Sequence, residues 1–324
     1  MSPLMQALFS QWEWRLIILI PLGILAVIYV TGWLTIRRRL GGRSRLANYW
    51  RLAAYIGGMV VLMTSLMSPI DLLGGQLFFM HMIQHLLTMM VAAPLLALSN
   101  PFPIGLWGLP TPLRRVVASG FVHDSWFRRA LTYVTRPSIV WFLYLVIYLG
   151  WHDPEFYTLA LRRDGVHDFQ HITFFVGSML YWWHVTGAGP RLHGQFPIWA
   201  RIVYLLAMIP PNMIAGIMIA LSPTVIYTYY ESVPRIWGYT VLQDQMAAGV
   251  IMWIPGSMMF LIAALVFVSK LLSGDGQEAP STSAALYDDA TLIAPGLENR
   301  VIQNRWRRLE RSGPPLSDSE SHQS

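Results

Sequence analysis

The 324-residue chain contains no cysteine, and only 12% of its residues are Asp, Glu, Lys or Arg. The absence of cysteine excludes disulfides, thiolate metal sites and cysteine nucleophiles, so any metal ion must be held by His, Met, carboxylates or backbone groups. A soluble domain carries about 25% charged residues, twice the share found here. Because 54% of the residues are apolar, the composition excludes a soluble enzyme and a disordered chain, and indicates a polytopic membrane protein.

Several catalytic and ligand-binding motifs are also missing. The run HMIQH has Met82 where the H-E-x-x-H metalloprotease motif needs its glutamate. The last apolar run has no lysine in its middle for a retinal Schiff base, and the chain has no glycine-rich phosphate loop. We therefore expect a protein that is not an enzyme, that binds no nucleic acid, and for which the sequence identifies no small-molecule substrate.

Apolar runs long enough to cross about 30 Å of hydrocarbon predict an all-α bundle of seven transmembrane helices. The predicted spans are residues 16–35, 52–72, 77–98, 137–151, 168–186, 198–221 and 246–272. Residues 99–136 begin with prolines and then alternate arginine pairs with apolar residues, which predicts a surface-lying amphipathic helix. Residues 1–272 are thus the expected membrane domain, and residues 273–324 are expected to form a mostly disordered tail.

The basic residues are distributed unevenly between alternate loops. Nineteen of the 23 lysines and arginines follow the first, third and fifth spans or lie in the tail. The other side carries only Arg15, Arg162, Arg163 and Arg235. Because the cytoplasmic loops of membrane proteins are enriched in Lys and Arg, we expect the N-terminus outside and the tail in the cytoplasm.

Five of the nine histidines fall at one predicted membrane depth, near the outer face of the bilayer. They are His81 and His85 in the third span, His152 at the end of the fourth, and His167 and His171 in the fifth. Each pair is an H-x-x-x-H motif. Residues i and i+4 of a helix share a face and are separated by about 6 Å along the axis, so both imidazoles of a pair can point at one ion.

Three further residues extend this pattern. Met89 continues the stripe of His81 and His85 along the third span. Asp244, like Asp71, falls at the outer end of a span; it either caps its own helix or orients a ligating imidazole by a hydrogen bond. His184 lies more than a dozen residues deeper than the second pair. The remaining histidines, His123, His193 and His322, are expected to be solvated.

The chemistry of these side chains limits which metal or cofactor they can bind. Imidazole, thioether and carboxylate together suit copper, and zinc less specifically. One alternative is a haem-binding redox or haem-modifying protein, since facing histidines can ligate haem iron. Two histidines one turn apart on a single helix nevertheless suit one small ion better than opposite faces of a macrocycle. The other alternative is a metal-free scaffold in which the histidines join helices by hydrogen bonds.

Several runs together resemble one known family. They are HMIQHLLTMMVAAPLLALSNP (81–101), WHDPEFYTLAL (151–161), HDFQHITFFVGSMLYWW (167–183), SPTVIYTYY (222–230) and LQDQMAAGVIMWIPG (242–256). This combination is similar to the CtaG family of caa-type cytochrome c oxidase assembly factors over about residues 10–272. Two positions depart from the family pattern, because Gln170 replaces a glutamate and His184 replaces a proline.

The resemblance has functional implications. It implies a multi-pass protein of the bacterial plasma membrane that is needed for making an active haem–copper oxidase, with copper supply as the usual suggestion for its role. The implied partners are cytochrome c oxidase subunits and the lipid bilayer, and the implied metal ligands are the five clustered histidines.

Overall fold

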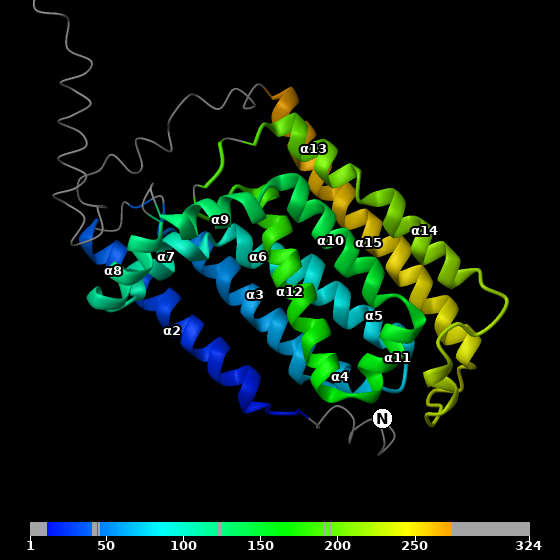
Figure 1. Ribbon diagram of the computed structural model, residues 1–324. Coiled ribbons are helices and arrows are strands. Elements are labelled where there is room, and N and C mark those ends of the chain that lie inside the picture. The colour runs from blue at the N-terminus through cyan, green and yellow to red at the C-terminus, as the bar shows by residue number, and fades with distance from the viewer. Residues whose placement is uncertain are drawn as a thin grey trace, which may run out of the picture.

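The computed structural model describes residues 12–40, 44, 46–121, 125–190, 192–194 and 196–273. These residues form helices joined by turns and loops, with no strand among them, which confirms the predicted all-α class. The long helices pack side by side in one bundle, and α8 and α9 lie across one of its ends (Figure 1). All of the predicted tail beyond residue 273 lies outside the described residues.

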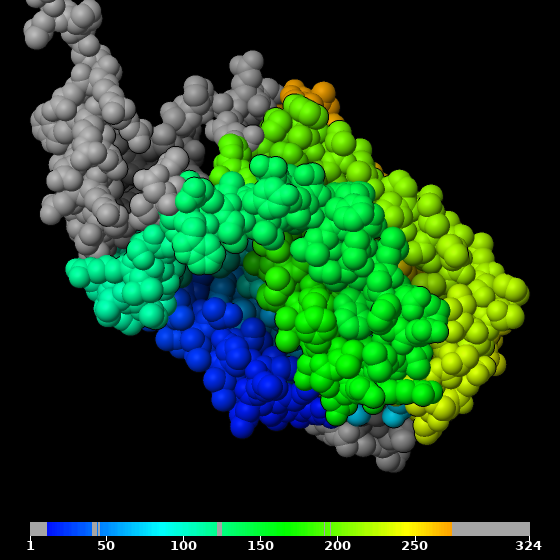
Figure 2. Space-filling view, in the orientation of Figure 1, coloured from blue at the N-terminus to red at the C-terminus, as the bar shows by residue number. Residues whose placement is uncertain are grey.

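In chain order, the helices are α2 (Leu16–Arg39), α3 (Tyr49–Met67), α4 (Pro69–Gly74), α5 (Phe78–Leu86), the π-helical turn η1 (Leu87–Ala92), α6 (Ala93–Leu98), α7 (Pro101–Gly108), α8 (Thr111–Gly120), α9 (Trp126–Val134), α10 (Pro137–Trp151), α11 (Pro154–Arg162), α12 (Asp164–Thr186), α13 (Ile198–Leu206), α14 (Ile209–Ala220), the 3₁₀ turn η2 (Thr228–Glu231) and α15 (Val241–Leu272). Figure 2 shows the face on which α2 (blue) lies beside α10–α12 (green).

Five helical stretches are long and apolar enough to cross a membrane. They are Leu16–Arg39, Tyr49–Met67, Phe78–Leu98, Ile198–Ala220 and Val241–Leu272. Together, α9 and α10 make a sixth, bent by 59° between them. The chain is therefore a multi-pass membrane protein. Two of the seven predicted spans are not long and apolar enough by themselves to cross a membrane. Helix α10 has 15 residues, which is about 22 Å of helix. Helix α12 begins with a polar third that contains both of its paired histidines.

The outer surface of the bundle is suited to lipid. Large apolar side chains that are about half exposed or more lie along α2, α14 and α15, among them Ile17, Val27, Met218 and Leu265. Exposed aromatic residues gather near the helix ends: Trp12, Trp14 and Tyr239 near one end of the bundle, and Trp50, Trp126 and Trp199 near the other. Aromatic belts of this kind are typical of the two membrane–water interfaces.

Proline breaks two of the predicted spans. The second span does not continue to residue 72, because α3 ends at Met67 and the short α4 begins at Pro69, with the Ser68 side chain capping it. The sixth span is interrupted between α13 and α14, where Pro210 and Pro211 occupy the first turn of α14. Proline has no N–H to continue the preceding helix but is well suited to a first turn.

The segment 99–136, predicted to be one surface helix, instead forms α7, α8 and α9. α7 packs against α2 so closely that a Cβ added at Gly108 would lie 1.8 Å from the Ile28 carbonyl oxygen, and one at Gly32 would lie 2.0 Å from the Ile104 oxygen. Only glycine permits this approach. Helix α9 agrees with the predicted position on the surface. None of its residues is buried, and Trp126 is 74% exposed.

Candidate metal centre

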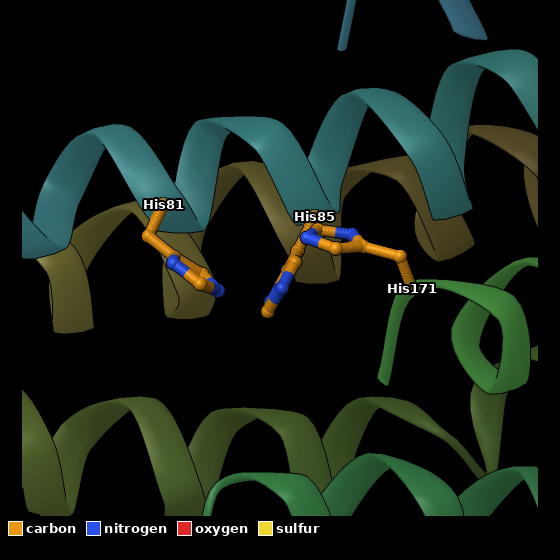
Figure 3. Close-up of side chains that lie close together, drawn as sticks. All are labelled: His81, His85 and His171. Carbon is orange, nitrogen blue, oxygen red and sulfur yellow. The ribbon is translucent and has the colours of Figure 1, made fainter. Parts of the chain in front are cut away.

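Helices α5 and α12 bring three of the predicted histidines into direct proximity. His81 and His85 extend from α5 and His171 from α12, and their rings lie together between the helices (Figure 3). One ring nitrogen from each of the three lies within 4.8 Å of the other two. All three side chains are buried, and His81 is fully buried, at 0% exposure. The spacing of four residues thus places both α5 imidazoles on the face that meets α12.

A second group of ligand atoms overlaps the first. Asp71, His167 and His171 also offer one atom each within a mutual 4.8 Å, so that His171 belongs to both groups. Asp71 and His167 are half-buried, whereas the first group is buried. The Nε2 atoms of His167 and His171 are 3.0 Å apart, which requires a proton on one ring and a lone pair on the other. A cation between these rings would occupy the place of that proton.

His152 approaches the same cluster from the end of α10. Its ring centroid lies 6.2 Å from that of His85. Its Nδ1 atom is 2.6 Å from the Tyr148 carbonyl oxygen, and because a carbonyl only accepts, Nδ1 must carry the hydrogen. The other nitrogen, Nε2, is therefore left as a lone pair, and it is buried without a hydrogen-bond partner. This is the tautomer that a metal ligand needs.

The ring nitrogens of the cluster are largely unpaired. Among the described residues, no geometrically sound hydrogen bond is formed by either nitrogen of His81 or His85, by Nδ1 of His171 or by Nε2 of His152, all of which are buried. The Gly74 backbone approaches the His81 ring without reaching hydrogen-bond geometry. Buried polar groups in proteins are nearly always hydrogen-bonded, and leaving one unpaired costs about 1–3 kcal/mol. One nitrogen from each of His81, His85 and His171 can bond to a shared cation, which explains why these nitrogens have no other partner, so the residues present fit a metal ion.

The short helix α4 places Asp71 beside the histidines. The break at Pro69 turns the chain so that α4 packs on α5, where a Cβ added at Gly74 would lie 3.4 Å from the His81 Cα. The Gln84 side chain donates to the Asp71 carboxylate and to the Ser65 carbonyl oxygen. Gln84 thereby ties α3, α4 and α5 together next to His85, and it orients the one carboxylate among the candidate ligand groups.

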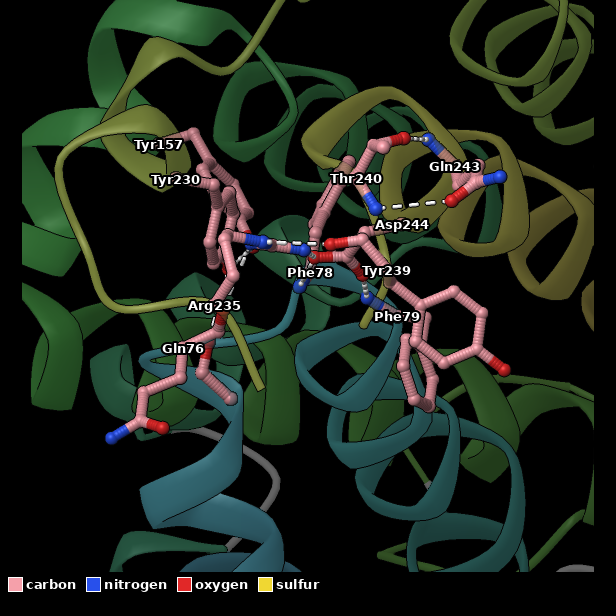
Figure 4. Close-up of polar contacts among 11 residues, drawn as sticks. Gln76, Phe78, Phe79, Tyr157, Tyr230, Arg235, Tyr239, Thr240, Gln243 and Asp244 are labelled. Carbon is pink, nitrogen blue, oxygen red and sulfur yellow. Dashed lines mark hydrogen bonds and ion pairs between the residues drawn. The ribbon is translucent and has the colours of Figure 1, made fainter. Parts of the chain in front are cut away.

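Asp244 has neither of the two roles considered from the sequence. Thr240 caps α15 in a capping box with Gln243, so Asp244 does not cap its own helix. Within the part of the chain that the structure describes, its carboxylate accepts from backbone N–H groups and an arginine and from no imidazole. The donors are the backbone N–H groups of Phe78 and Phe79, at 3.0 and 2.9 Å, and Arg235 at 2.9 Å (Figure 4). Asp244 therefore caps α5 from another helix and fixes the start of the segment that carries His81.

Met89 lies in the π-helical turn η1, four residues after His85. Its carbonyl oxygen has no donor within the helix, because the Ala93 N–H bonds to the Thr88 oxygen and residue 94 is proline, which has no N–H. The indole of Trp182 on α12 donates to this oxygen at 3.0 Å. The contact explains how a widened turn is held in the middle of the bundle, and it positions Met89 against α12.

The remaining predicted residues lie elsewhere. His184 is not part of the cluster: it lies at the opposite end of α12, with its ring 5.6 Å from that of His193. His193 is half-buried rather than solvated, and its Nε2 lies 2.9 Å from the Thr135 hydroxyl; burial lowers the pKa of His193 below its ordinary value. His123 and His322 lie outside the described residues.

The comparison with known proteins gives a clear family. A family model described as "Cytochrome c oxidase caa3 assembly factor" matches residues 27–273. The chain belongs to this family. The matched range contains all five clustered histidines, Asp71 and Asp244, and the match confirms the resemblance seen in the sequence. Proteins of the caa3 assembly factor family take part in making cytochrome c oxidase.

Two mycobacterial relatives of the chain are named as uncharacterized proteins. A protein of Mycobacterium bovis is 27% identical over 290 residues, which cover 86% of this chain and 42% of the relative. One from Mycobacterium leprae is 26% identical over 287 residues, covering 84% of this chain and 41% of the relative. The chain thus spans less than half the length of these relatives. No solved structure matches it.

Part of the site has no signal in the sequence. Asp71 stands out as a carboxylate in an apolar run, but its place beside His167 depends on the break at Pro69. Tyr157, whose ring lies 5.1 Å from that of His81, bonds to Tyr230, and Tyr230 bonds to the Gly74 carbonyl oxygen. These contacts join residues up to 156 positions apart, and no local pattern signals them.

Proposed function

We propose that the protein binds copper at the histidine cluster and supplies it to a haem–copper oxidase during assembly. The observation that carries this proposal is the convergence of unpaired, buried ring nitrogens from His81, His85 and His171. Neutral imidazoles avoid the cost of burying a charge when no ion is bound, and imidazole sites bind copper more tightly than the other divalent metals of the first row.

The proposed topology follows the basic residues. In this topology α10 and α12 also cross the membrane, which gives seven spans, with the histidine cluster toward the outer face of the bacterial plasma membrane and the N-terminus outside. The half-buried Asp71 and His167 then lie nearest the outer solution, where an ion can enter or leave. Copper is a cargo in this proposal, and none of the cluster residues has to make or break a covalent bond, so we propose no enzymatic activity.

The cavities near the cluster favour an ion over haem. The cavity next to His85 and His152 has a volume of about 30 Å³, and a macrocycle of haem size needs several hundred. A larger cavity of about 310 Å³ reaches only His171 among the five histidines. The haem alternative predicts a Soret band on the purified protein, and we expect none.

Oxidase assembly in cells tests the proposal. In a strain lacking its own copy of the protein, we expect His81→Ala or His167→Ala to abolish most oxidase activity while the protein still inserts into the membrane. The double variant should be little worse than either single variant, because each removal breaks the same ligand set. His193→Ala is the control and should support normal assembly. Normal oxidase activity with His81→Ala and His85→Ala would overturn the proposal and favour a metal-free scaffold.

A further inference from the structure

A small cavity continues inward from the histidine cluster. It has a volume of about 30 Å³ and lies among α5, η1, α10, α14 and α15. Since a buried water needs about 10–15 Å³ of such volume, the cavity has room for a single ion or for a few small atoms, and it is too small for an organic ligand. Four methionines line it: Met82, Met89, Met90 and Met252.

The lining of this cavity is rich in soft ligands, and no carboxylate is among the described residues that form it. Besides the methionines, His85 and His152 line it, and each has a buried nitrogen without a hydrogen-bond partner. The other polar residues of the lining, Tyr148 and Asn212, bond to each other. Thioether and imidazole are the neutral ligands that Cu(I) prefers, whereas divalent ions of the first row favour nitrogen and oxygen.

The cost of burying charge also favours a monovalent ion in this cavity. The energy of transferring an ion into a medium of low dielectric constant rises with the square of its charge, so a divalent ion loses about four times as much hydration energy as a monovalent one of the same size. A cavity without a carboxylate cannot compensate a second charge. It therefore selects a monovalent soft cation.

The fold places two consecutive methionines in this lining. Met89 and Met90 both belong to η1, whose π-helical turn contains more residues than an α-helical turn and so separates consecutive side chains by a smaller angle. The turn is held open by Pro94, which offers no N–H, and by the Trp182 indole on the Met89 carbonyl oxygen. π-Helical turns of this kind occur frequently at functional sites.

We propose that this cavity is a second metal station, selective for monovalent copper and held by methionine thioethers. The proposal rests on the copper-supply function proposed above and extends it inward. His85 and His152 belong to both the cluster and the cavity, and their ring centroids are 6.2 Å apart. Copper that enters as Cu(I) can therefore pass from the half-buried carboxylate and imidazole ligands, through the buried imidazoles, to the thioethers with no change of oxidation state and without losing protein ligands.

Metal titration of the purified full chain tests this second station. The probes are Cu(I), kept reduced and competed against a chromogenic chelator, and Ag(I), a monovalent soft ion that does not change oxidation state. We expect Met89→Leu combined with Met252→Leu to remove one equivalent of Ag(I), or to weaken its binding at least tenfold, while Cu(II) binding at the histidines is unchanged. Leucine preserves volume, so the fold should tolerate the change.

The matched control is Met258→Leu, since Met258 lies on the same helix as Met252 but is 52% exposed toward lipid. X-ray absorption of the Cu(I)-loaded protein should show sulfur as well as nitrogen ligands, and the number of sulfur ligands should fall in the double variant but not in Met258→Leu. Unchanged Ag(I) binding in the double variant, or a Cu(I) spectrum without sulfur, would overturn the second station alone. If the proposed copper-supply function were wrong, the His81→Ala variant would instead bind copper normally and support normal oxidase assembly.

Discussion

The capping of α5 by Asp244 allows a quantitative prediction for Asp244→Asn. The carboxylate is fully buried and accepts from two backbone N–H groups on one side and from Arg235 on the other. An asparagine side chain has only one oxygen and brings an N–H₂ group to the place of the other. One N–H of the first turn of α5 therefore loses its acceptor, and Arg235 loses its counter-charge.

The structure sets the expected size of the effect. Hydrogen bonds to charged groups contribute about 1.5–3 kcal/mol each, and a buried N–H left without an acceptor costs about 1–3 kcal/mol. We expect Asp244→Asn to lower the stability by about 3 kcal/mol. The matched control is Asp168→Asn, which breaks the 2.7 Å ion pair with Arg15. Both side chains of that pair are about one quarter exposed or more, so its loss should cost about 0.5 kcal/mol.

Thermal unfolding in detergent, followed by tryptophan fluorescence, measures the difference. The midpoint for Asp244→Asn should fall by roughly 6 °C or more, and that for Asp168→Asn by no more than about 2 °C. Adding Arg235→Gln to Asp244→Asn should cost little more than Asp244→Asn alone, because the two side chains act as one unit. Equal midpoints for Asp244→Asn and Asp168→Asn would refute the assignment of Asp244 as the cap of α5.

Three further predictions follow from other contacts. In the same unfolding assay, Gly108→Ala should destabilise the protein by more than about 2 kcal/mol, because its Cβ would lie 1.8 Å from the Ile28 carbonyl oxygen. Gly23→Ala is the control: a Cβ there has nothing within 4 Å, so the change should be neutral or slightly stabilising. Trp182→Phe should lower the midpoint by leaving the Met89 carbonyl oxygen without its donor, and a midpoint equal to wild type would contradict that role. Gly165 and Gly194 both have open space around them, so a cysteine can be introduced at either position. An impermeant reagent should label the cysteine at 165 from the outside, and should label the one at 194 only from the cytoplasmic side. The reverse pattern would invert the topology.

Much of the fold follows from local patterns. The apolar runs predict seven spans, and five of them correspond to helical stretches long and apolar enough to cross a membrane. The third run matches the stretch Phe78–Leu98 to within one residue. The four-residue spacing predicts that His81 and His85 share a face and that His167 and His171 share another, and the rings do lie together. Period and length are enough for these features because each depends on residues within a few turns.

Other features depend on contacts between distant segments and could not be predicted in this way. Asp244 caps a helix whose first residues lie more than 160 positions away. The segment 99–136 was predicted as one surface helix, but α7 packs on α2 through glycines that carry no apolar signal. The position of His184 in the sequence separates it along α12 from the pair His167 and His171, yet only the fold shows that its ring lies beside that of His193.

The central claim is that the buried imidazoles bind copper, and copper titration of the purified full chain tests it most directly. Wild-type protein should bind copper tightly with nitrogen ligands visible by X-ray absorption. His81→Ala and His171→Ala should each weaken that binding at least tenfold, and combining them should add little, because both belong to one buried ligand group. His193→Ala should bind as wild type does. Copper binding that is undiminished in His81→Ala and His171→Ala, or absent from the wild-type protein, would contradict the account.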